Sequence, residues 1–281
     1  MKTKRKTFIS REELERWQQQ QVDKHLEFVR NHSPYFREQL ATHHWEELPY
    51  MNKTIMMEHF DSLNTKGIRK EEAMQLALEA EKTRNFKAQI DDVTVGLSSG
   101  TSGNRGIFLV SEQEQSEWAG VILAKLLPRG LFSREKIAFF LRANSNLYES
   151  VKSRTIQFSF FDLIEPIETH VERLNELQPT IIVAPPSLLR MLASAKQSGE
   201  LNVTPIKMIS VAEVLESVDK KYIEKIFNLR LDIVYQATEG FIAHTCSHGT
   251  LNLNKEIMLI EKKFLDKEKL RFSPIITDFK R

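Results

Sequence analysis

The chain is organised around residues 93–110, which read Val-Thr-Val-Gly-Leu-Ser-Ser-Gly-Thr-Ser-Gly-Asn-Arg-Gly-Ile-Phe-Leu-Val. One apolar run enters a loop of small and hydroxyl-bearing residues, and a second apolar run leaves it. Glycine at Gly100, Gly103 and Gly106 lets backbone N–H groups converge, and the hydroxyls between them add rotatable donors, so the loop suits an anion such as a phosphate. A plain surface turn is the alternative, because glycine and serine are also common turn residues.

Composition narrows the class of protein. The chain has 281 residues, 41% hydrophobic and 28% charged, which is ordinary for one large globular domain or two smaller ones. Its 40 basic and 38 acidic residues give a net charge of +2, so we expect no nucleic-acid partner. No run approaches the roughly 20 apolar residues that cross a bilayer, so we expect no membrane partner. The single cysteine, Cys246, excludes an internal disulfide and predicts a cytoplasmic protein.

The first third of the chain has helical patterns. Ser10 and Glu13 have the spacing of a capping box, and apolar residues recur at helical spacing as far as about Leu40, with Pro34 ending the main helix. The charged segment 66–92 also reads mostly as a helix. These patterns predict a helical N-terminal extension over residues 1–92.

Beyond the loop, strand-like and helical segments alternate. Ser111 and Glu114 form a second capping box for a helix that runs up to Pro128. Alternation predicts an α/β core over residues 93–249, with mostly parallel sheets covered by helices. From residue 250 to 281 an alternating pattern predicts a small antiparallel C-terminal subdomain. The expected strands are 136–141, 156–163, 180–184, 206–211 and 231–235, and the expected helices are 168–177, 187–198 and 217–227.

Ligands of parallel α/β sheets bind beyond the carboxyl ends of the strands. The loops of interest are therefore those that follow the strands: 98–106, 142–150, 184–187, 210–215 and 235–240. The first differs from the P-loop of nucleotide hydrolases, because Gly103 is followed by Asn104 and Arg105 rather than by lysine and a hydroxyl residue.

Two further motifs lie at expected strand ends, Ser-Val-Ala-Glu-Val-Leu at 210–215 and Tyr-Gln-Ala-Thr-Glu-Gly at 235–240. A tyrosine face can stack on a base, a threonine hydroxyl can hold a phosphate oxygen, and a carboxylate can hold Mg²⁺. A helix cap followed by its first-turn carboxylate is the alternative for the Thr-Glu pair.

The ordered combination of the three motifs resembles the adenylate-forming superfamily, which includes the acyl-CoA synthetases. It is most similar to the phenylacetate-CoA ligase branch and its coenzyme-adenylating synthetase-like relatives. The segments 48–53 (Leu-Pro-Tyr-Met-Asn-Lys) and 272–279 (Phe-Ser-Pro-Ile-Ile-Thr-Asp-Phe) also fit, so the resemblance covers about residues 45–281.

The resemblance implies a role for each motif. The β and γ phosphates of ATP would bind Ser98, Ser99, Gly100, Thr101, Ser102 and Gly103. The adenine slot would be lined by Ala212 and Glu213, with Tyr235 near the base. Thr238 and Glu239 would be catalytic, Thr238 at the α-phosphate and Glu239 as the ligand of Mg²⁺. Many loops of the superfamily continue to a lysine whose position is Gly106 here, and Arg105 would supply a cation. The carboxylate substrate would lie against residues 141–148 and 185–187.

The implied activity is ATP-dependent adenylation of a small-molecule carboxylic acid to acyl-AMP with release of pyrophosphate. Formation of a thioester with CoA as a second step stays open. Superfamily members continue into a mobile domain with a catalytic lysine, so we expect this sequence to be the N-terminal part of such a ligase. Two alternatives remain, adenylyl transfer to a coenzyme hydroxyl and a non-catalytic nucleotide-binding or scaffold protein. The identity of the acid and a homodimeric state are also open.

Overall fold

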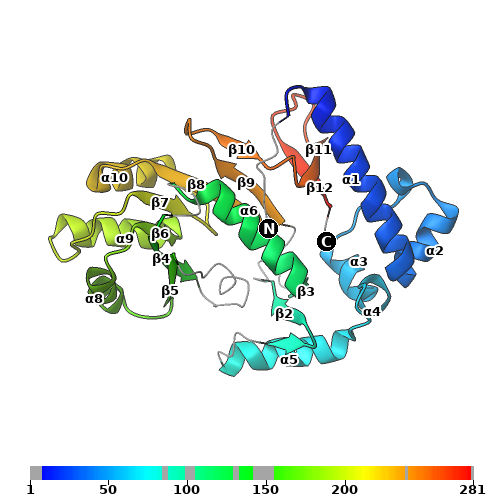
Figure 1. Cartoon of the computed structure of the whole chain (residues 1–281), viewed down its shortest axis with the longest axis horizontal. Coiled ribbons are helices and arrows are strands. Elements are labelled where there is room, and N and C mark those ends of the chain that lie inside the picture. The colour runs from blue at the N-terminus through cyan, green and yellow to red at the C-terminus, as the bar shows by residue number, and fades with distance from the viewer. Residues whose placement is uncertain are drawn as a thin grey trace. The chain divides into compact units, whose positions relative to one another are not determined.

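A computed structural model describes residues 8–83, 88–98, 105–128, 133–141, 155–237 and 240–279 (Figure 1). The chain divides into two compact units. Unit 1 contains Gln115–Leu253, and unit 2 contains Lys4–Glu114 together with Asn254–Arg281. The expected division into residues 1–92, 93–249 and 250–281 stays a prediction.

Unit 1 is built on a seven-stranded sheet with the strand order β10-β9-β8-β7-β6-β4-β5. The neighbours from β8 to β5 pair in parallel, whereas β9 and β10 add antiparallel strands. The strands are β4 (Glu135–Leu141), β5 (Ile156–Asp162), β6 (Ile181–Ala184), β7 (Lys207–Ser210), β8 (Leu231–Ala237), β9 (Gly240–Thr245) and β10 (Leu251–Leu253).

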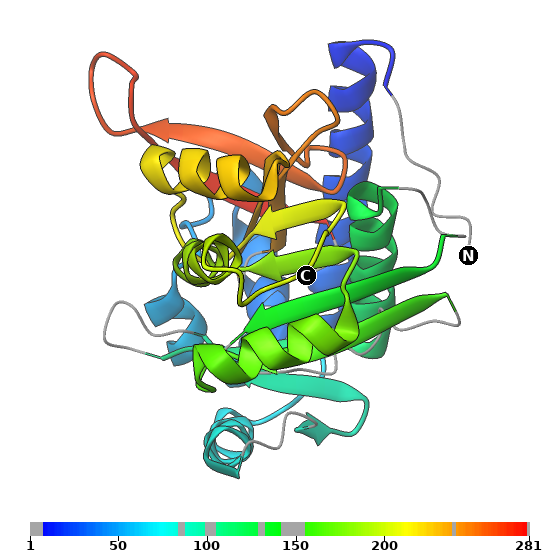
Figure 2. The ribbon, with the colours of Figure 1, turned by 90° about the vertical axis from the view of Figure 1, so that its left-hand side faces the viewer.

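Helices cover this sheet because each has an apolar side. Figure 2 shows α8 (Ile167–Leu177), α9 (Pro186–Gln197) and α10 (Ser217–Phe227) on one face of the strands. Leu174 of α8, Leu189 of α9 and Ile223 of α10 are fully buried in one core with strand residues such as Phe140 and Met208. The predicted α/β architecture with a mostly parallel sheet is therefore confirmed.

Of the two predicted capping boxes, the one at Ser111 is complete, whereas at Ser10 only the serine side-chain bond is present and the Glu13 carboxylate accepts the N–H of Ile9. In α1 (Arg11–His32) the Glu13 N–H donates to Ser10 Oγ at 3.3 Å, and the chain turns at Ser33 into α2 (Pro34–Thr42). Before α6 (Glu112–Leu126) the Ser111 N–H donates to Glu114 Oε2 at 2.7 Å, and the Glu114 N–H donates back to Ser111 Oγ. Short side-chain bonds at these positions explain why the sequence locates both helix starts so well.

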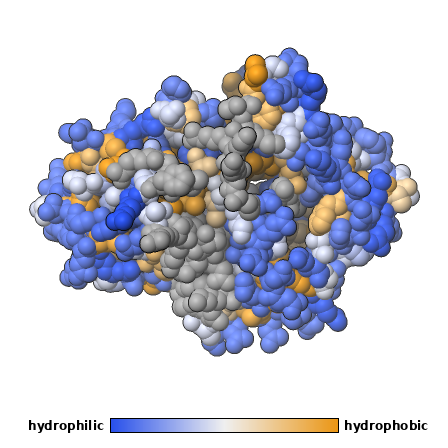
Figure 3. All heavy atoms as spheres, viewed as in Figure 1, coloured by the Kyte–Doolittle hydropathy of each residue, from blue (hydrophilic) through white to orange (hydrophobic). Residues whose placement is uncertain are grey.

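The remaining helices of unit 2 are short, apart from one. They are η1 (Trp45–Glu47), α3 (Lys53–Glu58), α4 (Phe60–Leu63) and the longer α5 (Lys70–Thr83). Helices α1, α2 and α5 show mainly hydrophilic side chains on the face seen in Figure 3. Among the described residues, no helix is both long and apolar enough to cross a bilayer.

Unit 2 contains two small antiparallel sheets. One has the order β1-β2-β3, formed by Gln89–Ile90, Val93–Leu97 and Ile107–Ser111, and the other pairs β11 (Met258–Phe264) with β12 (Phe272–Asp278). The C-terminal segment joins the N-terminal helix: Trp17 Nε1 donates to the Glu256 carbonyl at 3.0 Å, and Gln18 Nε2 donates to the Lys255 carbonyl at 2.9 Å.

The segment 66–92 is mostly a helix, as expected, because α5 covers Lys70–Thr83, although residues 89–90 pair with 93–94 as a hairpin. Two other expectations about local structure are wrong. The loop 98–106 does not follow a strand of the parallel sheet. It joins β2 to β3, whose residues pair antiparallel from Leu97↔Ile107 to Val93↔Ser111. Finally, β10 pairs with β9 of the large sheet, although its alternating pattern predicts a strand of the small subdomain.

Candidate nucleotide site

The base of the glycine loop is closed by Ser98. Its backbone N–H donates to the Gly106 carbonyl at 2.8 Å, and the Gly106 N–H donates to Ser98 Oγ at 2.9 Å. Ser98 is only 8% exposed, so these two bonds fix the entry and the exit of the loop against each other. The other expected phosphate-binding residues of the loop, Ser99, Gly100, Thr101, Ser102 and Gly103, lie outside the described residues.

Arg105 is held by the end of helix α5. Its Nη1 and Nη2 atoms lie 2.5 Å and 2.6 Å from the two carboxylate oxygens of Glu81, which is a bidentate ion pair. The hydrogen bonds that Arg105 donates to Glu81 raise the pKa of Arg105 above its ordinary value. The guanidinium that the sequence offers as the cation of the loop therefore already has a carboxylate partner.

The side chain of Lys53, from helix α3, also lies against the base of the loop. A Cβ atom built on Gly106 would lie 3.3 Å from Cγ, 3.4 Å from Cδ and 3.5 Å from Cε of Lys53. One helical turn later, Met57 Sδ accepts the N–H of Ile107 at 3.4 Å. Lys53 is not among the residues predicted for the site. Its sequence signal is weak, because it enters only as the last residue of the segment 48–53.

In unit 1 the loop after β7 brings Glu213 to helix α9. The Ser187 N–H and hydroxyl donate to the Glu213 carboxylate at 3.3 Å and 3.1 Å. Ala212 has a φ of +67°, in the left-handed region that residues other than glycine seldom adopt. Such strain persists only where the surrounding structure enforces it.

Ser210 is the last residue of β7 and is 1% exposed. Its hydroxyl has no hydrogen-bond partner among the described residues. A buried hydroxyl without a partner costs free energy, so this position at the carboxyl edge of the sheet is one where a polar ligand atom would be favoured.

Tyr235 lies on β8 and is 48% exposed, and the pairing of β8 with β9 is irregular between Tyr235 and Gln236. Thr238 and Glu239 lie outside the described residues. Within unit 1 the structure thus brings Glu213 together with Ser187. Within unit 2 it brings Ser98 together with Gly106 and Lys53. No group of three or more His, Cys, Asp or Glu among the described residues could hold a metal ion, so Mg²⁺ stays a prediction.

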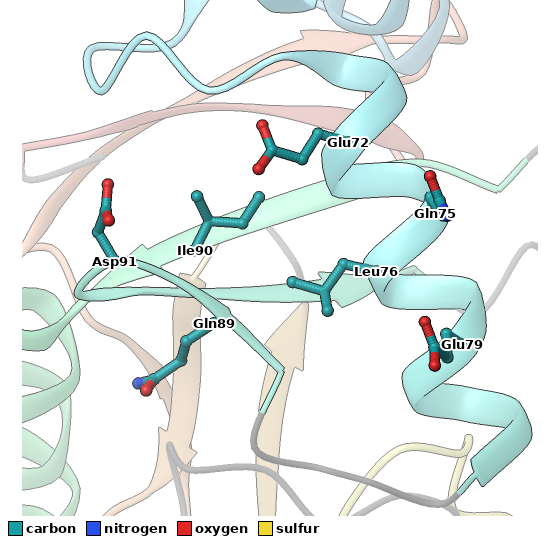
Figure 4. Close-up of a pocket in the computed structure, with 7 residues that line it drawn as sticks. All are labelled: Glu72, Gln75, Leu76, Glu79, Gln89, Ile90 and Asp91. Carbon is teal, nitrogen blue, oxygen red and sulfur yellow. The ribbon is translucent and has the colours of Figure 1, made fainter.

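A separate groove lies in unit 2 between helix α5 and the β1–β2 hairpin, with a volume of about 400 Å³. Leu76 and Ile90 form its apolar part, and carboxylates of α5 and the hairpin surround them (Figure 4). The residues that line it are Glu72, Gln75, Leu76, Glu79, Gln89, Ile90 and Asp91. None of them belongs to the residues predicted for nucleotide binding.

Comparison with known proteins supports the fold. No family model matches the sequence, and no curated protein matches it. Among solved structures, the chain is similar to 2-hydroxyisobutyryl-CoA ligase in an open conformation with 2-HIB-AMP and CoA, at 13% identity and a TM-score of 0.61 over 97% of this chain and 67% of that one. The thioesterification state of that ligase, again with 2-HIB-AMP and CoA, gives 14% identity and a TM-score of 0.66 over 97% and 61%. The postadenylation state of that ligase, with R3-HIB-AMP, gives 13% identity and a TM-score of 0.66 over 95% of this chain and 59% of that one.

These similarities define the class of fold. The chain has the α/β fold of a CoA ligase that has been crystallised with an acyl adenylate, and it spans 59% to 67% of the length of those ligase chains. The phenylacetate-CoA ligase branch stays a prediction, since these three structures are of a ligase named for a different acyl group, 2-hydroxyisobutyryl.

Proposed function

We propose that the chain is part of an enzyme that uses ATP to adenylate a carboxylic acid, giving acyl-AMP and pyrophosphate, with a CoA thioester as the product of a second step. The observation that carries the proposal is the fold shared with an acyl-AMP-bound CoA ligase over 95% to 97% of this chain. The three ordered sequence motifs support it independently, because fold similarity at this identity says nothing about individual residues.

The proposed reaction is a displacement at phosphorus. A carboxylate oxygen forms a bond to the α-phosphorus of ATP while the bond from that phosphorus to the bridging oxygen breaks, and pyrophosphate leaves with the electron pair. Two anions must approach each other, so the protein contributes mainly positioning and positive potential. We assign the β and γ phosphates to the glycine loop, whose two ends Ser98 and Gly106 hold together.

We assign the adenosine half of the nucleotide to unit 1. The left-handed turn at Ala212 and the partnerless hydroxyl of Ser210 fit a ligand that brings its own hydrogen-bonding atoms to the carboxyl edge of the sheet. Tyr235 would lie near the base and Thr238 near the α-phosphate. Glu239 would hold Mg²⁺, which neutralises phosphate charge when it is bound.

Calorimetric titration of the chain with ATP and Mg²⁺, and separately with AMP, tests the nucleotide site. We expect both nucleotides to bind. Exchange of labelled pyrophosphate into ATP, screened over aromatic and aliphatic acids, then tests acid adenylation. Exchange that depends on one class of acid supports the proposal. A chain that binds neither ATP nor AMP refutes it, and a chain that binds nucleotide but exchanges pyrophosphate with no acid supports adenylyl transfer to another acceptor or a scaffold.

A further inference from the structure

We propose that the tip of the β11–β12 hairpin, residues 261–272, binds the surface of a membrane that carries anionic lipids. The composition of the chain argues against a segment that crosses the bilayer, and a peripheral contact needs none. The contact lies outside the nucleotide site and does not depend on the proposed function.

The first support is a group of large apolar side chains that the tip leaves in solvent. Phe264 and Phe272 are opposite each other at the last pair of the β11–β12 ladder, and both are exposed. Leu265 and Leu270 continue into the turn and are 58% and 76% exposed. Exposed apolar groups gathered in one place on a surface mark contacts with another protein or with a membrane.

The second support is the positive charge beside these side chains. Residues 261–272 include five basic residues and three acidic ones. Lys262 Nζ lies 4.9 Å from the ring centre of Phe272, and Lys269 Nζ lies 5.5 Å from that of Phe264. Lysine stems lie along apolar surface while their ammonium groups stay in the polar phase. This mixture suits the boundary between the acyl chains and the phosphate head groups of a bilayer.

The third support is that the turn uses its central carboxylate internally. Asp266 Oδ1 accepts the N–H of Leu270 at 2.8 Å, and Asp266 Oδ2 accepts the N–H of Arg271 at 2.8 Å. Asp266 is half-buried, whereas every other residue of 261–272 is exposed. Among the exposed residues of the tip, basic side chains therefore outnumber acidic ones by five to two.

The shape of the tip favours lipid over a protein partner. Figure 2 shows the turn, drawn in orange-red, as a loop that extends beyond the ends of both strands. A convex tip fits a fluid surface, which closes around the apolar side chains that enter it, whereas a protein partner would need a matching hollow. The net positive charge selects anionic lipids, since each basic side chain near such a surface strengthens binding about fivefold.

The test is co-sedimentation of the chain with phosphatidylcholine vesicles that contain or lack phosphatidylserine. We expect wild type to bind the vesicles with phosphatidylserine about tenfold more tightly, or better, than those without it. Added salt should weaken this binding, because it screens charges that lie in water.

Two double variants separate the apolar and the charged contributions. Leu265→Ser with Leu270→Ser removes the two most exposed apolar side chains of the tip, and we expect binding to the anionic vesicles to fall about tenfold or more. Lys262→Gln with Lys267→Gln removes two positive charges, and we expect a fall of about twentyfold.

Matched controls make the same chemical changes elsewhere on the surface. Ile9→Ser with Ile164→Ser removes two exposed apolar side chains outside the tip. Lys24→Gln with Lys221→Gln removes two exposed positive charges from α1 and α10. We expect both controls to bind the anionic vesicles as wild type does. Thermal melting of each variant shows whether the fold is retained.

The outcomes assign the surface. The proposal is overturned if wild type does not bind vesicles with phosphatidylserine, or if both folded tip variants bind them as wild type does. A loss in the lysine control as large as in the lysine tip variant would make the binding an effect of net charge, which also overturns it. Sedimentation velocity without lipid tests the other kind of partner. Self-association of wild type that the leucine variant abolishes, in a chain that binds no vesicles, would assign the tip to a second copy of the chain instead.

Discussion

Replacing Gly96 with alanine should destabilise unit 2, because the phenyl ring of Phe108 occupies the place of the new methyl group. Gly96 and Phe108 are directly opposite each other on β2 and β3. A Cβ atom on Gly96 would lie 2.2 Å from Cζ of Phe108 and 2.7 Å and 2.8 Å from its two Cε atoms. Carbon atoms in contact prefer about 3.5–4.0 Å, so the ring would have to move by more than about 1 Å.

The magnitude follows from how the ring can escape. Overpacking typically costs about 1–3 kcal/mol, and Phe108 is only half-buried, so its ring can swing toward solvent and lose part of its contact with the sheet. Alanine also restricts the unfolded chain more than glycine does, which returns up to about 1 kcal/mol. We therefore expect a net loss of about 1–2 kcal/mol in the free energy of unfolding.

Urea unfolding of wild type, Gly96→Ala, Phe108→Leu and the double variant measures this effect as a cycle. Because the two residues touch, alanine at position 96 should cost much less beside leucine than beside phenylalanine, giving a coupling energy of about 1 kcal/mol or more. Equal costs of Gly96→Ala in both backgrounds would refute the steric argument. The same variant should weaken ATP binding, since β2 and β3 carry the two ends of the glycine loop.

Three further predictions concern unit 1. His170 is 1% exposed, and burial lowers its pKa below the ordinary value, so the folded state keeps the ring neutral while the unfolded state takes up a proton below about pH 6.5. The contribution of His170 to the free energy of unfolding should therefore be complete above that pH and fall as the pH drops toward the lower folded pKa. His170→Phe should flatten this fall when unfolding is measured between pH 7 and 5. Leu192→Ala should cost about 2–5 kcal/mol in urea unfolding, because the side chain is fully buried in the core beneath α9. Ala212→Gly should relieve the left-handed strain at φ +67° and raise the melting temperature, and a fall in melting temperature would contradict the strain argument.

Local signals explain what the sequence predicts correctly. The starts of α1 and α6 follow from side-chain bonds within four residues, Ser10 with Glu13 and Ser111 with Glu114. The parallel strands β4 to β8 follow from short apolar runs that lie between amphipathic helices. Each of these features is encoded within a few neighbouring residues, so no knowledge of the tertiary structure is needed.

The wrong predictions concern segments whose structure depends on which strand they pair with. An apolar run does not say which strand it will pair with, so residues 93–97 are predicted for the parallel sheet although they form a hairpin with 107–111. Residues 89–90 belong to a second hairpin with a turn at Asp91, which has a φ of +52°. The pair Asp91-Asp92 is a weak turn signal, and the charged pattern of the preceding helix masks it.

The candidate site depends even more on tertiary packing. Glu213 meets Ser187 across 26 residues and Arg105 meets Glu81 across 24, and no periodicity links either pair. The side chain of Lys53 lies against Gly106, and no pattern in the sequence reveals this contact. It forms only when α3 packs on β3, where the Ile107 N–H donates to Met57 Sδ.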